Sequence, residues 1–211
     1  NLVIICGLKM SRKIHKRVSS IHRITNETQI KVNVNLDGTG KNSITTGLPF
    51  FDHMVQQLSK HSLIDIDLKC NGDLDIDSHH TIEDVGWALG KAINEALGNK
   101  KGIKRYSFSY LPMDECLTRC CIDISGRPWL VWNVFLPNIT IKDIETEIFR
   151  EFFQSFSQSA EFTIHIENIY GQNTHHIIES CFKSMAISLR NAIDLDFRNL
   201  DSVPSTKGTL T

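Results

Sequence analysis

The sequence has no long hydrophobic run and almost no net charge. Its longest apolar stretch near the start, Leu2 to Leu8, is about a third of the ~20 residues that a membrane helix needs. The 211 residues carry 23 basic and 24 acidic side chains, a formal net charge of −1, which gives no reason to expect binding to nucleic acid or to an anionic membrane. With 41% hydrophobic and 22% charged residues, the composition is typical of a globular protein and excludes collagen, coiled coil and wholesale disorder.

Cysteine pairs with metal-binding spacing are also lacking. The six cysteines include no C-x-x-C motif and no zinc-ribbon spacing, so we expect buried thiols in a reducing compartment, the cytoplasm. Acidic residues are absent from residues 1–26, which carry six lysines and arginines. We predict that residues 1–22 form a basic leader without fixed structure, with Met10 as a candidate start. The alternative is the remnant of a segment targeting a plastid or another organelle.

Regular hydrophobic patterns begin after Glu27. Apolar and polar side chains alternate over residues 29–36, as in a half-buried strand, and the turn at 37–40 predicts a hairpin with the next strand. Pro49 favours the first turn of a helix, and Gly98 favours the end of one. The patterns predict strands at about 29–36, 41–46 and 63–72 and helices at about 50–60 and 79–97.

The second half of the chain repeats this order of elements. The two copies align at their most distinctive words, which begin at His79 and His175, 96 positions apart. We therefore predict an α+β fold of two duplicated strand-strand-helix-strand-helix half-domains, residues 23–110 and 111–200, followed by a tail at 201–211. Each half-domain is expected to be a four-stranded sheet with its helices on one face. The second-half elements are strands at about 116–124, 129–136 and 161–169 and helices at about 144–159 and 174–193.

A His-His-x-x-Glu motif opens the last helix of each half. Residues three or four positions apart share a helix face, whereas adjacent histidines point about 100° apart, so one imidazole and the glutamate can serve one cation while the other imidazole serves a second. Histidine with carboxylate suits Mn, Fe or Zn better than Ca or Mg. A single motif of this kind is more often a helix cap or a surface feature, but its repetition favours metal binding. The two copies comprise His79, His80, Glu83, His175, His176 and Glu179.

The first helix of each half adds one more candidate ligand. His53 lies on the first of these helices, and the duplication places Glu151 on the other, 98 positions later. Alone, either would more often be an ordinary polar side chain. The resulting set of eight ligands is enough for two six-coordinate metal sites that keep room for substrate or water.

The C-terminal tail has the composition of an anion site. Ser205, Thr206 and Lys207 place two hydroxyl groups and a cation beside a flexible glycine, which suits a phosphate. Arg105 and Arg127 can add bidentate guanidinium contacts. Taken by itself such a tail is usually only disordered. A P-loop is excluded at residues 35–42, because Asn35 replaces its first glycine and Asn42 replaces its hydroxyl residue.

These motifs together resemble those of the imidazoleglycerol-phosphate dehydratase family. The match runs in order from about residue 23 to 209, and its motifs are specific because seven of them would have to coincide. They are Arg23–Thr28, Phe51–Met54, Gly72–Asp84, Pro112–Glu115, Asp123–Pro128, the second His-His-x-x-Glu and Pro204–Gly208. The resemblance implies dehydration of imidazole glycerol phosphate to imidazole acetol phosphate in histidine biosynthesis, two Mn²⁺ ions per active site, a ribosomal S5 domain 2-like fold, and a 24-subunit homo-oligomer with active sites between subunits.

The resemblance also implies roles for individual residues. The family's metal ligands fall on the eight residues named above, although many members have histidine where this chain has Glu151. Glu27 matches the glutamate of the R-x-T-x-E-T word, close to the substrate, where it is our candidate for proton transfer. Further substrate contacts are implied for His53, His79, Arg105, Arg127, His175, Ser205, Thr206 and Lys207.

The mechanism is a hypothesis at this stage. The reaction removes a carbon-bound proton next to an imidazole rather than a carbonyl, so two metal ions on the ring nitrogens would hold the ring as imidazolate and give a diazafulvene-like intermediate. Glu27 would move the proton, or it would only bind a substrate hydroxyl. Two other classes stay open: a dinuclear metallohydrolase of phosphate esters, and a non-catalytic shell protein assembled by metal.

Overall fold

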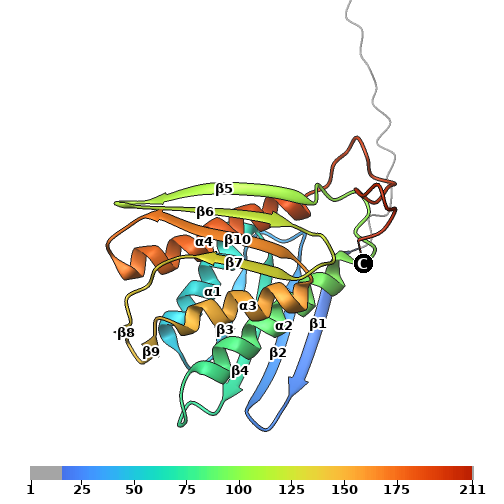
Figure 1. The fold of residues 1–211 in the computed structure, drawn as a ribbon. Helices are drawn as coiled ribbons and strands as arrows, with labels where there is room; N and C mark the ends of the chain where they lie inside the picture. The colour runs from blue at the N-terminus through green and yellow to red at the C-terminus, as the bar shows by residue number, and fades with distance from the viewer. Residues whose placement is uncertain (1–15, 211) are drawn as a thin grey trace, which may run out of the picture.

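The computed structural model describes residues 16–210 and shows two half-domains of the same topology. The first sheet has the strand order β1-β2-β4-β3 and the second has the order β5-β6-β10-β7 (Figure 1), so the predicted duplication and α+β class are confirmed. The first half contains β1 (Val18–Ile24), β2 (Thr28–Asn35), β3 (Asn42–Thr45), α1 (Pro49–Ser62), β4 (Asp65–Gly72) and α2 (His79–Leu97). The second contains β5 (Tyr106–Met113), β6 (Cys116–Asp123), β7 (Trp129–Asn133), a small hairpin of β8 (Thr140–Ile141) and β9 (Ile144–Glu145), α3 (Ile148–Ala160), β10 (Thr163–Tyr170) and α4 (Thr174–Ile193).

Each half starts with one strand that the sequence patterns did not predict. β1 begins at Val18, inside the predicted leader, and pairs with β2 along its whole length. It was missed because it lies at the edge of the sheet and buries no side chain fully, so hydrogen bonds to β2 hold it rather than an apolar pattern. The rest of the predicted leader, residues 1–15 with Cys6 and Met10, lies outside the described residues.

The predicted hairpin between β2 and β3 is wrong. β3 runs parallel to β4, with Ile44 opposite Leu68, and β2 pairs with the other side of β4. The Asp65 carboxylate accepts hydrogen bonds from the backbone N–H groups of Thr39 (2.8 Å) and Lys41 (2.9 Å). These bonds draw the turn across the start of β4, so the chain crosses over instead of folding back. β7 repeats the crossover beside β10 in the second half.

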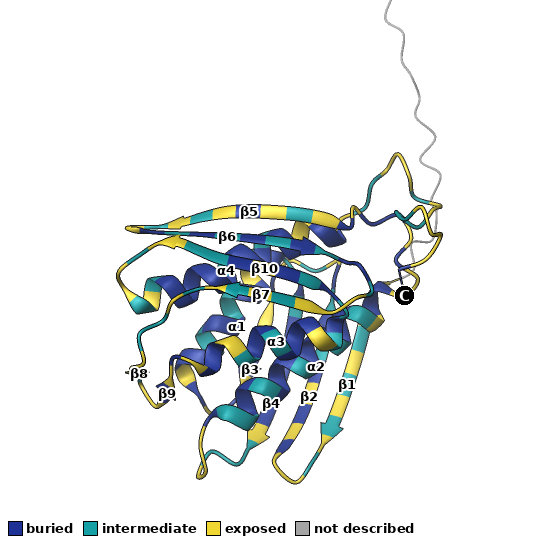
Figure 2. Cartoon of the chain, viewed as in Figure 1, coloured by how far each residue is buried: buried dark blue, intermediate teal, exposed yellow. Residues whose placement is uncertain are grey.

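The four helices lie between the two sheets. α1 and α2 cover the inner face of the first sheet, and α3 and α4 cover that of the second. The two pairs of helices meet with α2 against α3 and α1 against α4 (Figure 1). Figure 2 shows the resulting core as buried residues along the helices and at alternating positions of the central strands. Its largest fully buried side chains include Phe51, Phe149, Phe152, Phe153, Phe156, Phe162 and Phe182.

Two further observations concern the helices and the cysteines. Within residues 16–210, no helix combines the length and apolar character that a membrane crossing would require. The cysteines of this part of the chain are free thiols, and Cys70, Cys116, Cys120 and Cys181 are buried as predicted, whereas Cys121 is partly exposed. Burial raises the pKa of the Cys70 thiol to about 12, so this side chain stays neutral and unreactive.

Candidate active site

Both His-His pairs lie in the first turn of a helix. Asn173 caps α4 by accepting a hydrogen bond from the backbone N–H of His175 at 3.0 Å. At the start of α2 the Asp77 carboxylate, one residue before the N-cap Ser78, accepts a bond from the backbone N–H of His79 at 2.7 Å. These bonds fix where each helix begins. Each pair of imidazoles is therefore presented at a defined helix terminus.

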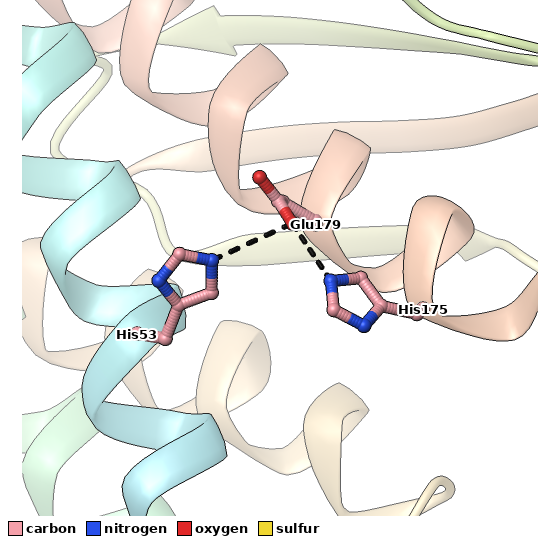
Figure 3. A group of neighbouring side chains, drawn as sticks. All are labelled: His53, His175 and Glu179. Atoms are coloured by element: carbon pink, nitrogen blue, oxygen red, sulfur yellow. Dashed lines mark hydrogen bonds and ion pairs between the residues drawn. The ribbon is translucent and has the colours of Figure 1, made fainter.

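Three of the predicted ligands come together in the structure. His53 on α1 and His175 and Glu179 on α4 each offer a ligand atom, and the three atoms lie within 4.8 Å of one another (Figure 3). Glu179 Oε2 is 3.0 Å from His175 Nε2 and 3.7 Å from His53 Nε2. Since α1 belongs to the first half-domain and α4 to the second, neither half could form this group alone.

The charge of this group suits a divalent cation. Burial favours the neutral form of the Glu179 carboxyl, but hydrogen bonds from Lys183 and His175 outweigh it and lower the pKa. The Lys183 ammonium lies 2.6 Å from Glu179 Oε1, which leaves Oε2 to face the two imidazoles. One carboxylate oxygen and two imidazole nitrogens form a donor set that fits Mn, Fe or Zn.

The duplicate of this group is less complete. His79 Nε2 lies 3.4 Å from Glu83 Oε2 on α2, which reproduces the pair on α4. Glu151 is on α3, the helix that packs against α2, but its carboxylate bonds to Arg150 at 3.0 Å. Within residues 16–210, His53, His175 and Glu179 are thus the one group of three such side chains whose ligand atoms all lie within 4.8 Å of one another.

The second histidine of each pair is held by a carboxylate that the sequence patterns did not select. His80 Nδ1 donates to Asp73 at 2.9 Å, and His176 Nδ1 donates to Glu115 at 2.7 Å. The bond to Asp73 raises the pKa of His80. Because both carboxylates occupy Nδ1, Nε2 is the nitrogen of each ring that is left to bind an ion. It lies 3.7 Å from a Glu27 oxygen in His80 and 3.9 Å from an Asp114 oxygen in His176. Asp73 and Glu115 lie inside two of the motifs of the family resemblance, and this position was the only signal for them.

Glu27 lies in the turn between β1 and β2, beside this second histidine. Its Oε1 atom is 3.7 Å from His80 Nε2, and its side chain is half exposed. The hydroxyl of Thr25 accepts the backbone N–H groups of Glu27 (3.2 Å) and Thr28 (2.9 Å) and so fixes the turn. Below it, the Asp84 carboxylate on α2 accepts hydrogen bonds from Thr28 and Arg23. The turn that carries Glu27 is therefore tied to the core.

The predicted anion-binding residues gather at another place. The buried Arg105 guanidinium donates to Asp123 at 2.7 Å and to the carbonyl of Pro204 at 2.8 Å. Arg127 is exposed and lies 4.0 Å from the same Asp123 carboxylate. The tail turns at Ser205–Lys207, where the Ser205 hydroxyl accepts the backbone N–H of Lys207 at 3.2 Å. Thr206 and Lys207 are exposed beside it.

The predicted anion-binding residues and the predicted ligands His53, His175 and Glu179 lie at opposite ends of α4. The backbone N–H of Arg105 donates to the carbonyl of Ala192 in the last turn of this helix, whereas His175 is in the first turn. Ala192 follows His175 by 17 residues, about 26 Å along an α-helix. In Figure 1 the C-terminal segment accordingly lies beside the end of α4, away from its start.

Comparison with known proteins identifies similar chains. The family model described as imidazoleglycerol-phosphate dehydratase matches residues 46–189. Curated proteins with that name from Sinorhizobium fredii and Ruegeria pomeroyi are 54% and 53% identical to this chain over 194 residues, which is 92% of this chain and 96% and 100% of theirs.

Two solved structures show the same fold. An imidazoleglycerol-phosphate dehydratase from Staphylococcus aureus superposes with a TM-score of 0.77 at 34% identity, covering 85% of this chain and 99% of its own. An IGPD from Pyrococcus furiosus, in complex with (S)-C348, superposes with a TM-score of 0.78 at 30% identity, covering 90% of this chain and 100% of its own.

Proposed function

The chain belongs to the imidazoleglycerol-phosphate dehydratase family, and from this premise we propose how its own residues serve the reaction. Membership assigns it a hydro-lyase activity in histidine biosynthesis, the dehydration of imidazole glycerol phosphate. The observation that supports the residue roles best is the group of His53, His175 and Glu179, whose three ligand atoms converge within 4.8 Å. Free buried thiols suit a reducing compartment, and we place the reaction in the cytoplasm.

Two divalent ions, which we take to be Mn²⁺, would be held by the eight predicted ligands. His53, His175 and Glu179 would hold one, and His79 and Glu83 with Glu151 would hold the other. His80 and His176, whose Nδ1 atoms are bonded to carboxylates, would each offer Nε2 to one of these two kinds of ion in a neighbouring subunit. When bound, the ions would supply Lewis-acid stabilisation of the substrate's imidazole in its deprotonated form. We propose that His53, His79 and His175 also contact the imidazole ring of the substrate.

The phosphate end of the substrate is bound by the other group. Arg105, Arg127 and the tail residues Ser205, Thr206 and Lys207 offer guanidinium, hydroxyl and ammonium donors for a phosphate dianion. Asp123 accepts from Arg105 and lies near Arg127, so it orients both cations. The Arg105 bond to the Pro204 carbonyl keeps the tail in place.

Within one subunit, the proposed metal-binding and phosphate-binding groups are too far apart to bind the same substrate molecule. A separation of about 26 Å along α4 is much longer than a three-carbon chain between an imidazole and a phosphate. One subunit therefore supplies metal ligands to a site whose phosphate-binding tail comes from another. This supports a homo-oligomer with active sites between subunits, and the 24-subunit size follows from the family resemblance.

Glu27 is the residue that we assign to proton transfer. Glu27 and Glu115 are duplicates, because each directly precedes the second strand of its half. Glu115 is engaged by the backbone N–H groups of Gln172 (3.2 Å) and Asn173 (2.8 Å) and by His176. In the first half Asp73 holds the equivalent histidine instead. The Glu27 carboxylate then keeps only a 3.7 Å ion-pair contact with His80 Nε2, so it can exchange a proton with the glycerol chain of the substrate.

Replacement of Glu27 by Gln tests this assignment. The substitution keeps the shape of the side chain but removes its ability to take a proton, so kcat should fall by about 10²- to 10⁴-fold. Metal content and particle mass should stay unchanged. The control is Glu115→Gln, which should weaken Mn²⁺ binding through His176 but keep turnover once Mn²⁺ is saturating. Near-normal turnover of Glu27→Gln would contradict the role of Glu27. Release of inorganic phosphate instead of the ketone would favour a hydrolase.

A further inference from the structure

Lys100 is a buried lysine in the loop between α2 and β5, and the proposed function does not use it. Its side chain is 7% exposed, and burial lowers the pKa of the ammonium group because it removes water from the charge. Its backbone is left-handed, with a φ of 57°, a conformation that glycine or asparagine adopts at lower cost than lysine. Neither the burial nor the backbone favours lysine at this position, so the explanation lies in what its side chain contacts.

The Lys100 ammonium holds the end of the C-terminal tail. Its Nζ atom donates to the carbonyl oxygen of Leu210 at 3.3 Å and lies 3.8 Å from Glu161 Oε2. The Leu210 side chain is buried as part of the core, and a buried carbonyl needs a hydrogen-bond donor. In Figure 1 the C-terminal segment accordingly lies beside the chain that joins α2 to β5. The lysine therefore fastens the tail to the fold at Leu210.

The same loop also holds the start of the tail. The backbone N–H of Gly102 donates to the carbonyl of Ser202 at 3.0 Å, and the Arg105 guanidinium donates to that of Pro204 at 2.8 Å. The loop itself is fixed by a backbone hydrogen bond of 2.8 Å from the segment that follows α4. One loop thus binds the tail on both sides of the turn Ser205–Lys207.

The hydrogen bonds within the turn are local. The Ser205 hydroxyl accepts the backbone N–H of Lys207 at 3.2 Å, and the Ser205 carbonyl accepts that of Gly208 at 3.0 Å. Residues 206–209 are exposed, whereas Leu210 is buried. Local bonds give the turn its shape but do not fix where it lies on the fold. Its position therefore depends on the bonds that hold the tail before and after it.

Lys100 is not placed to bind the phosphate itself. A cavity of about 460 Å³ adjoins it, and the charged residues that line this cavity are Lys100, Lys101, Glu95 and Glu161. Two cations and two carboxylates leave no positive excess for a phosphate dianion. Lys207, by contrast, is exposed on the turn. Lys100 can therefore affect the phosphate only through the tail that it holds.

We propose that Lys100 is a positioning residue for the anion-binding tail. By holding the Leu210 carbonyl it keeps the turn Ser205–Lys207 in place before the substrate arrives, so less conformational freedom is lost when the phosphate binds. The inference deepens the proposed function and rests on it for the role of the tail in phosphate binding. The phosphate is not among the atoms whose bonds change, so the effect should fall on KM rather than on kcat.

Lys100→Met tests this role in the Mn²⁺-loaded enzyme. The substitution keeps the length of the side chain but removes the ammonium group, and a buried charge is often replaced by an apolar side chain without loss of stability. We expect KM for imidazole glycerol phosphate to rise about tenfold while kcat stays within about twofold of the parent. Inhibition by inorganic phosphate should weaken by a similar factor. The matched control is Lys101→Met, which changes the exposed neighbour in the same loop and should keep the parent's KM. An unchanged KM in Lys100→Met would overturn the proposal.

Hydrogen exchange measures the position of the tail without turnover. Read by mass spectrometry on a peptide that covers residues 203–210, exchange should be faster in Lys100→Met than in the parent and unchanged in Lys101→Met. If Lys100→Met is poorly folded, Leu210→Ala releases the same end of the tail with the lysine in place. Faster exchange and a higher KM in that variant support the proposal, and parent values of both contradict it.

A double variant separates positioning from a general loss of structure. Lys100→Met and Leu210→Ala act through one contact, so together they should raise KM little more than the stronger of them does alone. Effects that multiply would mean that the two residues act independently, and the proposal would be wrong. Lys207→Ala removes a proposed phosphate contact directly. If its kcat/KM matches that of the parent, the tail does not bind phosphate and the proposed function fails at this point. If its kcat/KM falls while Lys100→Met keeps the parent's KM, only the role of Lys100 is wrong.

Discussion

Asp84 is the residue on which the position of Glu27 depends most directly. It lies on α2, is mostly buried, and accepts hydrogen bonds from Thr28 and Arg23. Arg23 also lies over the Trp87 ring at 5.1 Å. The network fixes both strands that flank the turn of Glu27. In the second half Ser180 occupies the position of Asp84, and the Ser180 hydroxyl lies 2.7 Å from that of Thr118. The first half therefore has a charged network where the second half has a neutral one.

We expect Asp84→Asn to lower both stability and kcat. Removing the carboxylate leaves the Arg23 guanidinium without its anion, which should cost about 2 kcal/mol of unfolding free energy, less than for a fully buried pair. Glu27 then samples more positions, so kcat should fall while metal content stays constant. Chemical denaturation and steady-state kinetics measure the two effects.

Ser180→Ala is the matched control for Asp84→Asn. It removes one buried hydrogen-bonding group at the duplicate position, at a cost of about 1 kcal/mol, but it does not touch the Glu27 turn. Its kcat should match that of the parent protein. Equal losses of kcat in the two variants would mean that the effect is general destabilisation rather than positioning.

At the scale of residues, the sequence identified those whose motif occurs in both halves. The two His-His-x-x-Glu motifs stand out because the same word appears twice on the same kind of helix. Asp73 and Glu115 hold equivalent histidines from unrelated positions, one after β4 and one before β6, so no repeated pattern marks them. Whether Glu151 ligates a metal stays a prediction, since Arg150 is its partner in this structure.

At the scale of elements, the contact between α2 and α3 joins the two halves. A Cβ atom added at Gly86 would lie 2.5 Å from the backbone oxygen of Phe152, and one at Gly90 would lie 2.5 Å from that of Phe156. The two glycines are about one helical turn apart, and both let the backbones of α2 and α3 approach closely. This close approach packs the phenylalanines of α3 against the first half-domain.

Gly86→Ala should therefore destabilise the protein although alanine favours helices. The gain in helix propensity is about 1 kcal/mol, but the contacting atoms belong to the Phe152 backbone, so the helices must separate at a cost of about 2–3 kcal/mol. We expect a net loss of about 1–2 kcal/mol in chemical denaturation. Lys91→Ala, on a more exposed part of α2, should stay within ~0.5 kcal/mol of the parent. A Gly86→Ala variant as stable as the parent would contradict the close packing.

Elements with strong periodicity were predictable, whereas the first strand of each half and the pairing partner of β3 were not. α2 and α4 begin and end where the sequence predicts, because caps and an apolar stripe mark both. β1 lacks a buried face, and the position of β3 depends on Asp65, a residue distant from it in the sequence. Pairing partners across a sheet are set by such tertiary contacts, which a local pattern does not contain.

At the scale of the whole molecule, the sequence motifs describe two groups of residues but not their separation. The proposed metal ligands and the proposed anion-binding residues belong to one chain, and the motifs alone suggest a single site. The length of α4 shows that they are about 26 Å apart. Distance of this kind depends on how the helices and the tail are placed, so it becomes visible only in the folded chain.

This separation predicts that two inactive variants can restore each other. Lys207→Ala damages the anion-binding tail, and His53→Ala damages the metal-binding group at the other end of α4. If each active site combines these groups from different subunits, a mixed oligomer contains some sites with both groups intact. Subunits of the two variants, dissociated and reassembled together with Mn²⁺, should therefore turn over substrate well above the sum of the separate preparations.

The control for this mixture separates shared sites from a general effect of reassembly. Lys207→Ala mixed with Ser205→Ala brings together two chains damaged in the same tail, so no combination of subunits supplies an intact one, and activity should stay at the level of the separate variants. Recovery only in the first mixture requires sites that span two chains. If the first mixture stays inactive while native-like particles form, each site must be built within a single subunit, and the tail would have to move along the whole of α4 to reach the metal ligands.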